Sequence, residues 1–104
     1  MREIKEIVGL IEDEIEAAEE YAEAAERTAH DDLRRLYIEL AEVELGHITK
    51  LHSKAAHLIE EYKSKGHTPP VAMQAVWDHE HERMMRDVTE IKMRLDTVEQ
   101  MHSR

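Results

Sequence analysis

Cysteine and phenylalanine are absent from the 104 residues, and tryptophan occurs once. Without cysteine, the chain can form no disulfide, no thiolate metal site and no rubredoxin-type iron centre. Without phenylalanine, a large self-contained aromatic core is not available. A chain of this length fits one domain, residues 1–104, and it buries little surface alone, so oligomerisation is a common remedy.

Positive charge is also scarce, because 14 lysines and arginines face 24 aspartates and glutamates, for a net charge of −10. This balance argues against nucleic acid or an anionic membrane as a partner and suits cations, although any soluble acidic helical protein would show it too. After Met1 there is no apolar signal-peptide core, and no apolar run approaches a membrane-spanning length. We therefore expect no membrane partner and a cytoplasmic location.

Apolar residues recur at every third or fourth position in three segments, which is typical of amphipathic helices. We predict an all-α fold with helices at about residues 3–29, 32–65 and 69–102. The first stripe is Ile4, Ile7, Val8, Ile11, Ile15, Ala18, Tyr21, Ala22 and Ala25. The second is Leu33, Leu36, Leu40, Val43, Ile48, Leu51, Ala55, Leu58 and Tyr62. The third is Trp77, His81, Met84, Val88, Ile91, Leu95, Val98 and His102.

The segments between the stripes carry helix-end signals. Asp31 and Asp32 are expected to cap the second helix through their carboxylates. Gly66 follows that helix and is expected to end it. Thr68 followed by two prolines predicts an N-cap and the start of the third helix. The short turn at residues 29–32 makes the first two helices an antiparallel hairpin.

Three ligand-type side chains, Glu14, Glu44 and His47, lie within these stripes. A buried ionised carboxylate is costly unless it is paired or bound to a metal. Glu14 precedes residue 29 by 15 positions and Glu44 follows it by 15, so both should lie at the same height, roughly 22 Å from the turn. His47 is one turn beyond Glu44 on the same face. We expect these side chains to converge, with Tyr21 pointing into the same interior.

Glu44-x-x-His47 on one helix, with a lone Glu14 on its neighbour, resembles the half-site of ferritin-like di-iron proteins. Glu14 followed by Tyr21 also resembles the first helix of bacterioferritins and rubrerythrins, and AEVELGHITKL resembles their second metal helix. The short hairpin offset between the two glutamates is most similar to the encapsulated ferritins, in which one chain supplies half of a ferritin bundle. The resemblance covers about residues 4–60.

The resemblance implies an all-α, ferritin-like antiparallel hairpin with a third helix, and a four-helix bundle completed by dimerisation. It implies that Glu14, Glu44 and His47 are iron ligands, with Tyr21 beside them. One chain offers half of the ligands of a di-iron site, so a two-fold homodimer or a larger ring of dimers would complete it. The implied activity is that of a ferroxidase, which oxidises Fe(II) to Fe(III) with oxygen or peroxide for iron storage or detoxification.

Two features depart from encapsulated ferritins. The C-terminal DTVEQMHSR is not obviously the small apolar tag that docks in an encapsulin shell, and the third predicted helix is longer than theirs. An encapsulin shell as partner, and a location inside such a nanocompartment, therefore stay open. Gly46 lies in the middle of the second predicted helix, where glycine destabilises a helix by about 1 kcal/mol relative to alanine. We expect that this glycine permits close approach of a partner helix.

Other interpretations of these residues stay open. The Glu–Glu–His set could be a hydrogen-bonded triple in a non-catalytic helical metal-binding or interaction module. A rubrerythrin-type peroxidase is less favoured, since the chain lacks a cysteine-ligated electron donor. A second metal site could use pairs from a ligand-rich run, although a solvated acidic face or an inter-subunit contact is preferred; the run supplies Asp78, His79, His81 and Glu82. Four histidines are expected at the surface: His30, His52, His57 and His67.

Overall fold

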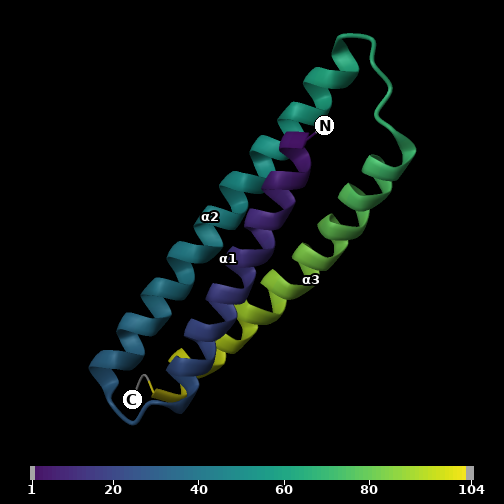
Figure 1. Ribbon diagram of the computed structural model, residues 1–104. Coiled ribbons are helices and arrows are strands. Elements are labelled where there is room, and N and C mark those ends of the chain that lie inside the picture. Colours follow the sequence, from purple (N-terminus) through teal and green to yellow (C-terminus); the bar gives the residue numbers. More distant parts are fainter. Residues whose placement is uncertain (1, 103–104) are drawn as a thin grey trace.

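The computed structural model describes residues 2–102, which form three helices: α1 (Arg2–Arg27), α2 (Asp31–Ser64) and α3 (Val71–His102). Helix α2 runs antiparallel to both α1 and α3 (Figure 1). The all-α class is confirmed, and the helix ends differ from the predicted ones by no more than two residues. Within residues 2–102, none of the helices has a stretch long and apolar enough to cross a membrane.

The three helices form a narrow body measuring 56 × 18 × 17 Å, with α1 between the other two (Figure 1). α1 packs closely on α2 and also contacts α3, whereas α2 and α3 meet only sparsely. A groove therefore separates α2 from α3, and Leu45, Gly46 and Leu95 are among its lining residues. The third helix thus covers one side of the hairpin and leaves the other side open.

The predicted stripe of α1 forms the core, and seven of its positions are buried: Ile4, Val8, Ile11, Ile15, Ala18, Ala22 and Ala25. The predicted stripe of α2 was wrong in part, because Leu33, Leu36 and Val43 are 39%, 44% and 51% exposed. The face that α2 buries carries Ile38, Ala41, Leu45, Ile48, Ala55 and Ile59. Helix α2 therefore has two apolar faces, and apolar periodicity alone does not tell which of them meets α1.

The predicted stripe of α3 is buried at five positions, Trp77, Met84, Ile91, Leu95 and Val98. His102 was expected in this stripe and is exposed, because it is the last residue of the helix. Arg94 of α3 pairs with Glu26 of α1 through two hydrogen bonds, which lower the pKa of Glu26. α3 is therefore held to α1 by apolar packing and by a two-pronged ion pair near the turn end of the molecule.

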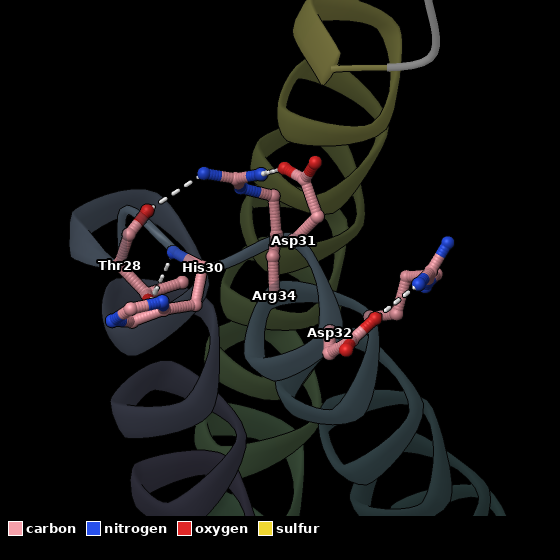
Figure 2. Close-up of polar contacts among 6 residues, drawn as sticks. Thr28, His30, Asp31, Asp32 and Arg34 are labelled. Carbon is pink, nitrogen blue, oxygen red and sulfur yellow. Dashed lines mark hydrogen bonds and ion pairs between the residues drawn. The ribbon is translucent and has the colours of Figure 1, made fainter.

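The turn between α1 and α2 is tied by Arg34, whose side chain is only 7% exposed (Figure 2). Its guanidinium donates to the backbone carbonyl of Thr28 at 2.6 Å and to the carboxylate of Asp31 at 2.6 Å. The expectation that Asp31 and Asp32 cap α2 was wrong. His30 is the N-cap residue and makes no side-chain capping bond, since the helix already begins at Asp31. Both aspartates lie in the first turn, where negative charge favours the helix dipole.

The other end of α2 closes at Gly66, as predicted, in the left-handed conformation with φ of 83°. The N–H of Gly66 donates to the carbonyl of Lys63, and the N–H of His67 donates to that of Tyr62, which is a Schellman motif. Thr68 is not the N-cap of α3, because the first helical bond runs from the N–H of Gln74 to the carbonyl of Pro70. A residue that precedes a proline is disfavoured in the helical region, so the helix starts later.

Two glycine substitutions should have opposite effects on stability. Among residues 2–102, a Cβ at Gly46 would meet nothing within 4 Å, so Gly46→Ala should stabilise the chain by about 1 kcal/mol through helix propensity. Gly66→Ala should destabilise it by about 1 kcal/mol, because its φ is positive. Urea unfolding followed by circular dichroism measures both. Destabilisation by Gly46→Ala would mean that another helix fills the groove.

Candidate metal centre

The hairpin register brings Glu14 of α1 beside Glu44 and His47 of α2. One ligand atom from each residue lies within 4.8 Å of the other two. His47 Nδ1 is 3.5 Å from Glu14 Oε2 and 3.7 Å from Glu44 Oε2. We call these three residues the triad. The structure therefore places the predicted ligand residues together, at the height that equal spacing from the turn requires.

The two carboxylates of the triad lack a permanent positive partner. Within residues 2–102, the only cationic group found in contact with Glu14 or Glu44 is His47, which is charged only when it is protonated. Glu14 Oε2 is buried and has no hydrogen-bond partner. Most buried polar atoms are paired, so an unpaired carboxylate oxygen next to a second carboxylate indicates a place for a cation.

The donor set also suits a metal. Carboxylate and imidazole ligands with open positions are typical of iron(II), manganese and zinc sites. The side chains of Glu14, Glu44 and His47 are 27%, 19% and 48% exposed, so the triad lies at the surface of this chain and can accept further ligands from outside. The residues present therefore fit a divalent metal ion bound at an incomplete site.

The surface around the triad is apolar. The exposed Leu36 and Val43 and the half-buried Leu40 follow the same side of α2 as Glu44 and His47, because residues three or four positions apart share a helix face. On α1, Leu10 is 50% exposed one turn before Glu14. We define the open face as Leu10, Glu14 and Tyr21 of α1 with Leu36, Leu40, Val43, Glu44 and His47 of α2. Tyr21 is half-buried and packs against the core cluster.

A second row of carboxylates on α1 faces α3 and differs from the triad because arginines neutralise it. Arg83 lies 3.7 Å from Glu12, and Arg94 pairs with Glu26. Burial raises the pKa of Glu80, and a hydrogen bond from this carboxyl to Glu12 raises it further. Arginines and a shared proton within the chain thus offset the negative charges of Glu12 and Glu26. Glu14 and Glu44 lack such partners among residues 2–102.

The ligand-rich run of α3 does not converge in the same way. Asp78 accepts a hydrogen bond from Gln74 at 3.0 Å, while His79 and Glu82 are exposed. His81 faces His52 of α2. Across residues 2–102, three ligand-type side chains come together only in the triad.

The expectation that His52 is a surface residue was wrong, because its ring is half-buried against Trp77 and His81. A signal for this was present in the sequence: His52 is four residues after Ile48 and three before Ala55, both of which are buried.

Comparison with known proteins found no match: no family model, no curated protein and no solved structure is significantly similar to this chain.

Replacing Glu14 by Gln tests the triad as a metal site. Wild-type chain should be stabilised by Co(II), by about 2.7 kcal/mol at a hundredfold excess over the dissociation constant, and Glu14→Gln should lose most of this gain. Without metal, Glu14→Gln should melt slightly higher, because it removes a negative charge beside Glu44. Thermal unfolding with chelator and with Co(II) measures both effects. Glu20→Gln, at an exposed position of the same helix, is the control, and equal metal stabilisation in all three chains would contradict the site.

Proposed function

We propose that this protein is a ferritin-like ferroxidase, which binds Fe(II) at the triad and oxidises it to Fe(III). The observation that carries the proposal is a pair of carboxylates beside a histidine, one of them with a buried unpaired oxygen, with no Lys or Arg partner among residues 2–102. Fe(II) is the substrate, and two Fe(II) ions would give one electron each to O₂, which takes up two protons to become H₂O₂. The cellular purpose would be iron storage or detoxification.

The triad supplies half of the ligands that such chemistry uses. Ferritin-like di-iron sites take one glutamate from each of two helices and a Glu-x-x-His pair from each of the other two. One chain offers one of each, so two chains related by a two-fold axis would provide the full set. Four carboxylates would then balance the charge of two Fe(II) ions.

The open face supports this pairing. It carries exposed leucine and valine side chains on both sides of the triad, and contiguous exposed apolar surface marks interaction sites. The third helix of the chain lies on the other side of the hairpin, where α1 pairs with it through Glu12 and Glu26. A second copy could therefore dock two hairpins into a four-helix bundle, as a homodimer or within a ring of dimers.

Each ligand residue would have a definite task. Glu14 and Glu44 would bind and bridge the two Fe(II) ions, and their negative charge would favour the Fe(III) product. His47 would bind through Nδ1, the nitrogen that faces both carboxylates. Leu40 and Val43, on the same side of α2, would exclude bulk water from the joined site. Tyr21, two turns along α1, would border this interior.

A non-catalytic metal carrier is the second candidate. One chain already offers three ligands at a partly exposed position, and zinc sites use three protein ligands and an open position in many proteins. Such a carrier would bind metal without redox chemistry and without needing a second chain.

Iron oxidation separates the two candidates. Anaerobic loading with Fe(II) followed by air should produce Fe(III) absorbance, with two fast-oxidising irons per two chains. Glu44→Ala or His47→Ala should slow the fast phase by roughly a hundredfold or more, since one lost ligand removes much of the binding and positioning, while far-UV helicity persists. His57→Ala, at an exposed position of the same helix, should oxidise iron normally. Tight metal binding with no oxidation would favour the carrier.

Assembly should depend on the metal. In the apo dimer, the four glutamates would repel one another, and Fe(II) or Co(II) would both neutralise them and join ligands from two chains. Divalent metal should therefore shift dilute chains toward the dimer, and Glu44→Ala should abolish this shift. Analytical ultracentrifugation across a concentration series, with chelator and with metal, measures it. Equal mass distributions in all samples would contradict a shared site.

A further inference from the structure

His52 of α2 and His81 of α3 meet in the sparse contact between these helices. His52 Nε2 lies 2.7 Å from His81 Nδ1, which is hydrogen-bond distance. One ring must donate its proton and the other must accept with a lone pair. The bond therefore exists only while at least one of the two imidazoles is neutral.

The same contact includes the single tryptophan of the chain. The rings of His52 and Trp77 are stacked with centroids 5.2 Å apart, and His81 lies one turn beyond Trp77 on α3. Trp77 is 9% exposed and belongs to a small apolar cluster that is separate from the main core; its other buried members are Ile4, Val8, Ala55 and Ile59. Against α2, the N-terminal half of α3 is held by this cluster and by the histidine pair. Against α1 it is also held by Arg83 and Glu80, which contact Glu12, and by Met84, which lies in the main core cluster.

The C-terminal half of α3 is held by other residues. Ile91, Leu95 and Val98 belong to the main core cluster, and Arg94 pairs with Glu26 of α1. The contact of the N-terminal half with α2 is therefore separate from these attachments, and its release would not require release of the whole helix.

Few charges could compensate a proton on the pair. On α2, the residues one turn from His52 on either side are uncharged. On α3, Asp78 precedes His81 by one turn, but it is exposed, so solvent and salt screen its charge. On α1, the carboxylate of Glu12 is engaged with Arg83 and Glu80. Two protonated imidazoles would therefore face each other with little to offset their repulsion.

Two imidazoles alone do not make a closed metal site, since zinc takes four ligands. We propose instead that the His52–His81 pair is a proton-sensitive latch, which holds the N-terminal half of α3 against α2 when it is neutral and releases it in acid. Protonation of both rings breaks the hydrogen bond, adds repulsion, and lets Trp77 leave its cluster. The latch lies on the other side of the hairpin from the triad and does not depend on the proposed ferroxidase.

The direction of the pH effect follows from His52. Burial and the neighbouring His81 lower the pKa of His52 from its ordinary value of 6.5. Between the lowered value and 6.5 the unfolded or released state binds a proton that the latched state does not, so the latched state loses stability as the pH falls through this range. Above 6.5 His52 is neutral in both states and the latch is closed.

Because Trp77 is the only tryptophan, acrylamide quenching of its fluorescence reports opening directly. Between pH 7.5 and 5.5, in chelator and at low protein concentration, the quenching constant of wild type should rise about twofold or more as the local contact opens. In His81→Gln the partner of His52 carries no charge at any pH, so the constant should stay low. His57→Gln changes an exposed histidine of α2 that pairs with Glu61 and should behave as wild type.

Each other outcome would overturn the latch. A quenching constant that does not change with pH in wild type would mean that α3 stays docked when the histidines are protonated. A fall in fluorescence intensity without greater acrylamide access would mean that an imidazolium merely quenches the adjacent indole. Loss of far-UV helicity in step with quenching, in His81→Gln as well, would mean that the whole chain unfolds in acid.

Discussion

The hydrogen bonds of Arg34 across the first turn are the constraint on which the site depends. The guanidinium joins the last residue before the turn bend, through the carbonyl of Thr28, to Asp31 at the start of α2. One residue more or less in this turn would rotate α2 by about 100° and shift it by about 1.5 Å. Glu44 would then no longer face Glu14. The triad is thus aligned by a turn some four helical turns away.

The alignment of α1 and α2 holds the negative charges of Glu14 and Glu44 close together, which is electrostatically unfavourable. On the α3 side of α1, Glu12 contacts Arg83 and shares a proton with Glu80, and Glu26 pairs with Arg94. On the open face, His47 is the only cationic partner of Glu14 and Glu44 found within residues 2–102. Functional sites often retain such locally unfavourable groups, because a ligand later compensates them. The two sides of α1 therefore differ, because Glu12 and Glu26 have arginine partners and Glu14 has only a histidine among its partners in residues 2–102.

The sequence was sufficient for the number of helices, their approximate ends and the meeting of Glu14, Glu44 and His47, because these follow from periodicity and from equal counting around a turn. It was not sufficient for the face that α2 buries. Leu36 and Val43 fit an apolar stripe as well as Ile38 and Leu45 do, and only packing against α1 distinguishes them. The His52–His81 contact was also missed, because it joins residues whose relative placement depends on how α3 docks. The predicted N-caps at Asp31 and Thr68 were wrong for local reasons. α2 already begins at Asp31, and the two prolines after Thr68 delay the start of α3.

The short turn also has a consequence for the order of folding. Closing a loop of a few residues costs little entropy, and contacts that are local in sequence form fast. We therefore expect α1 and α2 to pair first, and α3 to dock afterwards through the segment that begins at Gly66. All three triad residues lie on α1 and α2. The triad is thus assembled at the first tertiary step, before α3 has found its place.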